Sequence, residues 1–146
     1  MTMFALSAPV SRYAALGWAA FIVLLLSLPG NSVPRFSFHL IGIPSDAIVH
    51  AVLFCIQALL LGRAFASGGL PAPFTPVSRF SAMMLASCTS IMYGAVTELW
   101  QHVIPGRSGD VMDLVADAAG AGLAFLLMIA MNRRERHPDR SVSSYP

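Results

Sequence analysis

Four long apolar runs, separated by short polar segments, dominate this chain of 146 residues. The runs cover Arg12–Pro29, Asp46–Ala66, Phe80–Ile104 and Val111–Met131. A helix needs about 20 mainly apolar residues to cross the hydrocarbon core of a bilayer. None of the runs shows the alternation with period two that is typical of a half-buried strand. The pattern therefore predicts an all-α, polytopic membrane protein with four transmembrane helices, because helices satisfy their own backbone polar groups in lipid.

Turn-forming residues separate the runs. The segment Pro29-Gly30-Asn31-Ser32 follows the first, Gly and Pro residues over 67–76 follow the second, and Pro105-Gly106 follows the third. The first run also has features of a signal peptide, but it is long for one and no A-x-A site follows, so we expect it to be retained. We therefore predict one four-helix transmembrane domain over 1–132 and a polar, disordered tail over 133–146.

The composition supports a membrane location. Only 11% of the residues are charged and 56% are hydrophobic, and the mean hydropathy is +0.69. A soluble domain carries about 25% charged residues. The net charge of +2 is too small and too dispersed to predict nucleic-acid binding. Cys55 and Cys88 provide neither a disulfide framework nor a metal-ligand spacing, and we expect both to be small buried packing residues.

The arginines predict the orientation of the chain. All nine basic residues are arginine. With the N-terminus in the cytoplasm, seven arginines face that side and only Arg35 and Arg107 face the other. The seven are Arg12, Arg63, Arg79, Arg133, Arg134, Arg136 and Arg140. The positive-inside rule therefore places both termini in the cytoplasm, and we expect a multi-pass protein of the bacterial cytoplasmic (inner) membrane.

This topology gathers polar residues at the outer end of the bundle. The candidate ligand-binding residues are Asp46, His50, Glu98, Gln101, Arg107, Asp110, Asp113 and Asp117. Candidate residues on the same helix are three or four positions apart, which puts them on one face of that helix. At 1.5 Å per residue, Asp117 lies about 10 Å deeper than Asp110. Ionisable groups at such a depth are costly and face the protein interior or a wet cavity, so we predict a polar cavity open to the outside.

The charges of this outer end do not balance. Its five carboxylates carry −5 and Arg107 returns +1, which leaves −4 when the histidines are neutral. One arginine cannot compensate for five carboxylates. The sequence therefore leaves three possibilities: some carboxylates are protonated, a cation binds, or some carboxylates face water.

The ordered set of polar motifs resembles the VanZ-like family of bacterial membrane proteins. The motifs are Asp46-Ala-Ile-Val-His50, Glu98-Leu-Trp-Gln101, Pro105-Gly-Arg107, Asp110-Val-Met-Asp113 and Gly120-Ala-Gly122, within a core over 45–127. The chain departs from the family pattern at Ala47, where a basic residue is common, and at Asp117, where the family usually has Asn. The second departure changes the charge of the cluster.

The resemblance implies a role in the cell envelope more firmly than it implies a reaction. The family takes its name from a factor that lowers sensitivity to teicoplanin. We therefore expect an envelope protein that binds a membrane lipid, a lipid-linked cell-wall precursor or a glycopeptide in its outer cavity and that affects sensitivity to this antibiotic. We predict no nucleic-acid partner.

The alternative is a membrane enzyme that acts on a lipid-linked substrate at the outer leaflet. Glu98 or Asp113 would be the general base, His50 the acid or second base, and Arg107 would stabilise negative charge. Ser108 is the only candidate nucleophile, and a loop or capping role suits it better. A transporter is disfavoured, since four helices are few and no inverted repeat is present.

The residues alone predict no cofactor. Metal assistance through His50, Glu98 and Asp113 is chemically possible, since imidazole and carboxylates bind several divalent ions. Their spacing along the chain, however, matches no recognised metal motif, so no metal site is predicted.

Purely structural roles stay open for several of these residues. Asp46 and Asp110 can cap their helices, and Asp113 can favour the positive end of its helix dipole. His50 can be a core histidine bonded to Asp46 or Glu98.

Glu98 has no cap to make in the body of its helix, which favours a functional role. Gln101 can simply link helices by hydrogen bonds, and Arg107 can extend to lipid headgroups, pair with Glu98 or hold an anion. The stripe Ala116-x3-Gly120-x3-Ala124 predicts close helix packing.

Overall fold

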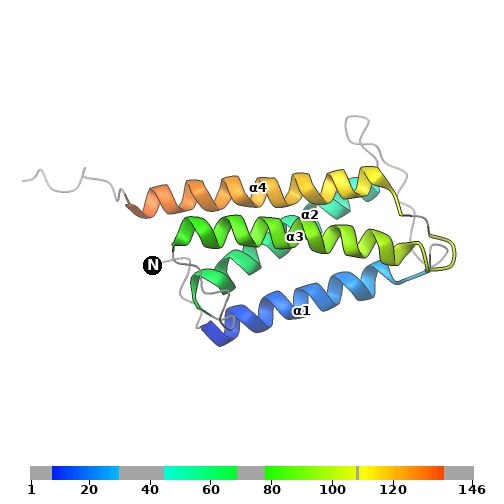
Figure 1. Ribbon diagram of the computed structural model, residues 1–146, viewed down its shortest axis with the longest axis horizontal. Helices are drawn as coiled ribbons and strands as arrows, with labels where there is room; N and C mark the ends of the chain where they lie inside the picture. Colours follow the sequence, from blue (N-terminus) through cyan, green and yellow to red (C-terminus); the bar gives the residue numbers. More distant parts are fainter. Residues whose placement is uncertain (1–7, 30–44, 69–77, 108, 137–146) are drawn as a thin grey trace, which may run out of the picture.

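The described residues form four helices and no strand (Figure 1). In this computed structural model, residues 8–29, 45–68, 78–107 and 109–136 are described. The helices are α1 (Ala8–Leu26), α2 (Ser45–Ala66), α3 (Arg79–Gln101) and α4 (Val111–Arg136). The all-α prediction is therefore confirmed. Arg35 and Ser108 lie outside the described residues.

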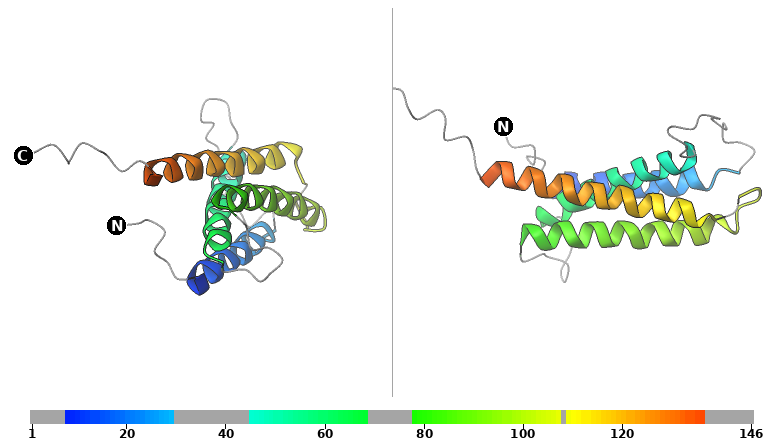
Figure 2. Two further views of the ribbon diagram at one scale, coloured as in Figure 1. Left: turned by 60° about the vertical axis from the view of Figure 1, so that its left-hand side comes forward. Right: turned by 90° about the horizontal axis from the view of Figure 1, so that it is seen from above.

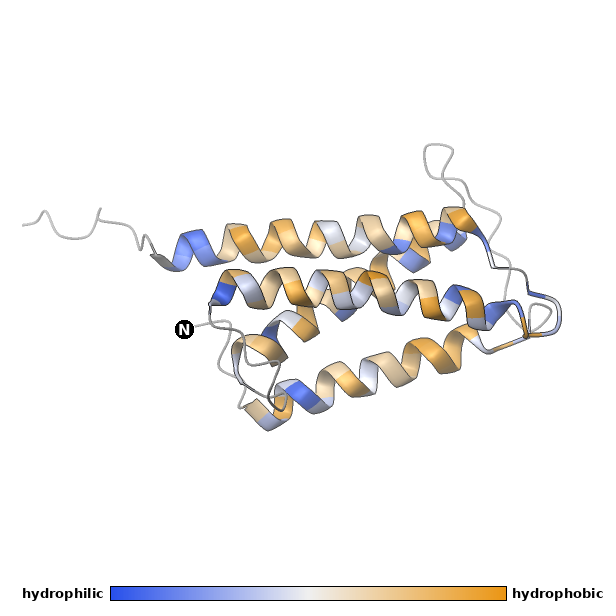
Figure 3. Cartoon of the chain, in the orientation of Figure 1, coloured by the Kyte–Doolittle hydropathy of each residue, from blue (hydrophilic) through white to orange (hydrophobic). Residues whose placement is uncertain are grey.

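All four helices are long and apolar enough to cross a membrane. Apolar residues cover the bodies of the helices, while the polar residues gather towards the helix ends (Figure 3). Large apolar side chains such as Leu24, Met92 and Leu99 are about 70% exposed on the outside of the bundle. Such an exterior suits lipid rather than water, which supports a multi-pass membrane protein.

The helix bounds differ from the predicted runs for local reasons. Helix α1 ends at Leu26 rather than at Pro29, because a residue that precedes proline disfavours the helical conformation. Helix α3 ends at Gln101, three residues before the predicted Ile104. A turn follows it and includes Gly106 with a φ of 75°, a conformation that glycine adopts without strain.

Helix α4 runs five residues beyond the predicted end, to Arg136. The prediction of a disordered tail is therefore wrong for residues 133–136. Arg79 of α3 donates to Glu135 and to Asn132, which ties the end of α4 to the start of α3. Arginines near a helix C-terminus also interact favourably with the helix dipole.

Helix α2 packs against each of the other helices, and its contact with α4 is the most extensive in the bundle. A Cβ atom on Gly120 of α4 would collide with the backbone of Ala51 in α2. Ala116 and Ala124, one turn away on each side, are buried in the same contact. The predicted packing role of this small-residue stripe is confirmed, because only glycine at position 120 lets the two backbones approach so closely.

Polar side chains attach α1 to the rest of the bundle. The indole of Trp18 donates to the Leu53 carbonyl at 3.0 Å, and the Tyr93 hydroxyl donates to the Ala19 carbonyl at 2.6 Å. Near the outer end, the Trp100 indole donates to Ser27 Oγ at 2.9 Å. Helix α1 is therefore an integral part of the helical packing.

The up-and-down order of the helices brings the end of α1, the start of α2, the end of α3 and the start of α4 to one end of the bundle (Figures 1 and 2). We call this the outer end, following the orientation that the arginines predict. The side of the membrane on which it lies stays a prediction.

The cysteines partly contradict the prediction of buried packing residues. Both are free, but Cys55 is half-buried and Cys88 is exposed on the outside of the bundle. Cysteine behaves as a small apolar residue, and a surface that faces lipid accepts such residues as readily as a core does.

Candidate functional site

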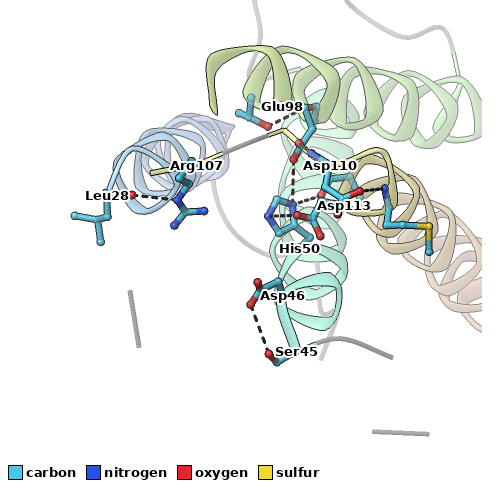
Figure 4. A network of polar contacts seen from close by, with 12 residues as sticks. Leu28, Ser45, Asp46, His50, Glu98, Arg107, Asp110 and Asp113 are labelled. Carbon is cyan, nitrogen blue, oxygen red and sulfur yellow. Dashed lines mark hydrogen bonds and ion pairs between the residues drawn. The ribbon is translucent and has the colours of Figure 1, made fainter. Parts of the chain in front are cut away.

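His50 lies at the centre of a polar cluster near the outer end, one turn into α2. The residue is only 3% exposed. Its Nδ1 forms a hydrogen bond with Asp117 Oδ1 of α4 at 2.9 Å, in which an ionised Asp117 accepts from the ring. The same nitrogen lies 3.7 Å from Glu98 Oε1 of α3, and Nε2 lies 3.9 Å from Asp113 Oδ2 of α4. Three helices therefore meet at one imidazole ring, as Figure 4 shows for Glu98 and Asp113.

Glu98 joins the cluster to the loop between α3 and α4. Its Oε2 accepts the backbone N–H of Asp110 at 2.9 Å. The other oxygen, Oε1, is buried and has no hydrogen-bond partner among the described residues. The residue as a whole is 6% exposed. One carboxylate oxygen thus holds the loop in place, while the other is directed towards His50 without a hydrogen-bond donor (Figure 4).

Asp117 is the most deeply buried carboxylate of the cluster, with no exposed surface. It fits there because α3 carries Gly94 beside it. A Cβ atom at position 94 would lie 2.6 Å from Asp117 Oδ2 and 3.0 Å from its Cβ. Even alanine would therefore have to displace the Asp117 side chain, so Gly94 makes room for the carboxylate that binds His50.

Asp110 is the residue before α4, and Asp113 lies in the first turn of that helix. The Asp110 carboxylate accepts the Met112 backbone N–H at 2.8 Å, which is the N-cap interaction. Asp110 is exposed, so its main role is structural. Asp113 points into the cluster and keeps 18% of its side chain exposed. Asp113 therefore connects the buried His50 to the outside.

Besides the exposed Asp110, three of the predicted site residues lie outside the cluster, which consists of His50, Glu98, Asp113 and Asp117. Asp46 is exposed in the first turn of α2, and its side chain accepts from Ser45 Oγ at 3.5 Å rather than pairing with His50 (Figure 4). Arg107 donates Nε–H to the Leu28 carbonyl at 3.0 Å, which ties its loop to α1. Gln101 is buried, and its Nε2 has no partner in the described part of the chain.

Of the two partners considered for His50, Asp46 bonds to Ser45 instead, and Glu98 Oε1 lies 3.7 Å from the ring nitrogen Nδ1; of the roles considered for Arg107, pairing with Glu98 is not the one that the structure shows. These alternatives rested on proximity along the chain or on charge. The structure instead gives His50 a partner 67 residues away and gives Arg107 a backbone carbonyl.

Two cavities of the bundle lie away from the cluster. The larger, of about 530 Å³, is an apolar groove between α2 and α4. Its lining residues are Ala47, Ile48, Ala51, Val52, Cys55, Ile56, Met112, Val115, Ala116, Ala119, Gly120 and Leu123. It opens to the outside of the bundle, since Val52 and Val115 are more than half exposed. We call it the α2/α4 groove.

The second cavity, of about 190 Å³, lies at the opposite end of the bundle and includes Arg63 and Arg79 in its lining. Neither cavity is lined by a cluster residue. Both cavities therefore lie outside the cluster, and Asp113 is the cluster residue that reaches the surface.

Two glycines that position the site were not predicted from the sequence. Gly94 faces Asp117, and Gly109 lets the loop before α4 lie against the end of α3. A Cβ atom on Gly109 would lie 2.8 Å from the Glu98 carbonyl oxygen and would collide with His102. Glycines in apolar or turn segments usually indicate packing or turns, so the sequence carried no signal for these roles.

The family model of VanZ/LLP1 matches residues 1–132. No curated protein and no solved structure matches the chain. The matched residues include all four membrane-spanning segments except the last residues of α4.

Proposed function

The chain belongs to the VanZ/LLP1 family, and on that basis we propose that it binds a membrane lipid or a lipid-linked cell-wall precursor in the bacterial cell envelope. The apolar chain of the ligand lies in the α2/α4 groove. Its polar group lies at the outer end, beside Asp113.

One observation carries this proposal: the groove and the polar cluster occupy the same helical turns. Ala47 and Ala51 line the groove on either side of His50 in the sequence of α2. Met112 and Ala116 do the same around Asp113 in α4. A ligand with an apolar tail and a polar headgroup matches this arrangement, because the tail can follow the groove towards Ile56 and Leu123 while the headgroup lies at the outer end beside Asp113.

The character of the groove favours a lipid over a glycopeptide. Its lining is almost wholly apolar and includes four alanines and one glycine, whose small side chains leave room for an alkyl chain. Burial of alkyl chain contributes about 0.8 kcal/mol per CH₂ group relative to water. In a bilayer this gain in free energy is small, because the alkyl chain is already surrounded by lipid. Specificity for the ligand therefore has to come from its polar group at the outer end. An effect on teicoplanin sensitivity would follow from sequestration of a lipid-linked precursor.

The proposal that the groove holds a lipid chain can be tested by filling the groove with a larger side chain. Ala119 is exposed and lines the groove, while Ala130 is an exposed alanine of α4 outside it. We expect native mass spectrometry of wild type and Ala130→Phe, released gently from their own membrane, to show a retained lipid. We expect Ala119→Phe to lose it, because the ring occupies the space of the alkyl chain. Equal retention in both variants, or no retained lipid in the wild type, would contradict the proposal.

One observation also supports the alternative that the protein is a membrane enzyme. The His50–Asp117 pair at 2.9 Å, with Asp113 on the other side of the ring, resembles the arrangement that orients a histidine for proton transfer. Under this alternative, purified protein would convert an envelope lipid extract to a new product and His50→Gln would abolish the conversion. A complete lack of turnover by the wild type would leave binding as the function.

A further inference from the structure

We propose that His50, Glu98 and Asp113 bind a divalent transition-metal ion. One donor atom from each residue lies within 4.8 Å of the others. The three residues come from α2, α3 and α4, so a bound ion would join the helices that form the outer end. This inference goes beyond the lipid-binding proposal and does not depend on it, because the ion can bind whether or not the α2/α4 groove is filled.

The first argument is the orientation of the imidazole ring. His50 Nδ1 is hydrogen-bonded to Asp117 Oδ1; when Asp117 is ionised the ring donates this bond, and the lone pair of Nε2 then faces Asp113. Histidines that bind metals usually donate their other ring N–H to a carboxylate or carbonyl, which fixes the tautomer and makes the ligand nitrogen more basic. Asp117 plays this part here, as a positioning residue.

The second, independent argument is an unsatisfied oxygen. Glu98 Oε1 is buried, lies 3.7 Å from His50 Nδ1, and has no hydrogen-bond partner in the described ranges. A buried polar atom without a partner costs about 1–3 kcal/mol, and more when it is charged. The other Glu98 oxygen is already held by the Asp110 N–H. The carboxylate is therefore fixed in place with one oxygen available to a cation.

The third argument is charge. Glu98, Asp113 and Asp117 together carry −3 when ionised, and no ion pair among the described residues joins an arginine to them. A divalent ion would reduce this to −1. Buried charges persist in proteins when they are paired or when they coordinate metals, so an ion resolves the imbalance that the sequence had left open.

The donor set indicates which ions fit. One imidazole nitrogen and two carboxylate oxygens suit Zn²⁺, Mn²⁺ or Fe²⁺, whereas soft ions such as Cu⁺ prefer sulfur ligands. Bonds of about 2.0–2.2 Å around a tetrahedral ion place neighbouring donors about 3.4 Å apart. The three donor atoms lie within 4.8 Å of one another, and His50 Nε2 and Asp113 Oδ2 are 3.9 Å apart, so binding would draw the donors together by up to about 1.4 Å. Three protein ligands leave a coordination position for water or an oxygen-donor ligand.

Manganese is the probe that tests the site. Protein purified in detergent is stripped with a chelator and titrated with Mn²⁺, and free Mn²⁺ is followed by electron paramagnetic resonance. We expect one saturable site per chain and a ¹⁴N coupling to the bound ion from His50. We expect His50→Ala and Glu98→Gln to weaken binding more than 100-fold. Asp117→Asn should weaken it about 10–100-fold, as for other residues that orient a ligand.

The matched control is Asp46→Asn, which removes an exposed carboxylate one turn from His50 on the same helix. It should leave Mn²⁺ affinity unchanged, and circular dichroism should show that every variant keeps its helices. Absence of saturable binding of Mn²⁺ or Zn²⁺ to folded wild type would overturn the proposal. So would bound Mn²⁺ without nitrogen coupling, or an equal loss of affinity in Asp46→Asn and Glu98→Gln, because either result indicates a diffuse acidic surface.

Discussion

The contact between Gly120 and Ala51 gives the most direct test of how this bundle is held together. A Cβ atom at position 120 would lie 2.8 Å from the Ala51 carbonyl carbon and 3.0 Å from its Cα, and closer still to its oxygen. Ordinary contacts of a Cβ atom are 3.4–4 Å. All three atoms belong to backbone and cannot rotate away. In Gly120→Ala, helices α2 and α4 must therefore separate by about an ångström, because the Ala51 carbonyl oxygen is the closest of the three atoms.

Overpacking of this kind typically costs about 1–3 kcal/mol. Alanine recovers part of that cost, because it favours a helix by about 1 kcal/mol over glycine. We therefore expect Gly120→Ala to lower the free energy of unfolding by up to about 2 kcal/mol. Gly122 supplies a matched control on the same helix, since a Cβ atom there meets nothing within 4 Å. Gly122→Ala should leave stability unchanged or raise it.

The assay is equilibrium unfolding of purified protein in mixed detergent micelles, followed by far-ultraviolet circular dichroism. The two variants and the wild type are compared under one set of conditions. Equal stabilities of Gly120→Ala and Gly122→Ala would refute the reasoning, because the two substitutions have the same helix propensity and differ only in the backbone that they meet.

Three further predictions concern α1, the orientation and the outer loop. Trp18→Phe should lower the free energy of unfolding by about 1 kcal/mol, because the indole N–H loses its carbonyl partner on α2; an unchanged unfolding curve would argue against that bond. In a cysteine-free background, a membrane-impermeant thiol reagent added to intact cells should label Asp46→Cys and spare Arg134→Cys, and the reverse pattern would invert the topology. Glu98→Ala should speed hydrogen–deuterium exchange of the Asp110 amide, whereas Glu98→Gln keeps an oxygen acceptor and should preserve its protection.

The position of Asp117 has a consequence for the family resemblance. The resemblance to the VanZ-like family implies Asn at this position, and an Asn side-chain carbonyl can also accept an Nδ1–H from His50. Either residue can therefore orient the ring, whereas Asp117 also adds a negative charge that Asn would not carry. If an ion binds at the cluster, Asp117 would strengthen its hold through the charge as well as through the geometry.

The sequence by itself determined the class of the fold and its family. Four apolar runs of membrane-spanning length predicted four helices, because lipid offers no partner to backbone polar groups. The order of the polar motifs predicted the family that the match over 1–132 now shows. Helical periodicity also identified Ala116-x3-Gly120-x3-Ala124 as a packing stripe, since spacing along one helix determines its faces.

Only the tertiary structure decided which polar residues meet. His50 pairs with Asp117 rather than with Asp46, although Asp46 is one turn away on its own helix. The choice depends on how α2 and α4 cross, and that crossing depends on a backbone contact at Gly120. Likewise, Gly94 creates space for Asp117 from a different helix. Spacing along one chain fixes the faces of single helices, but contacts between helices depend on their crossing angles and distances, which no local pattern encodes.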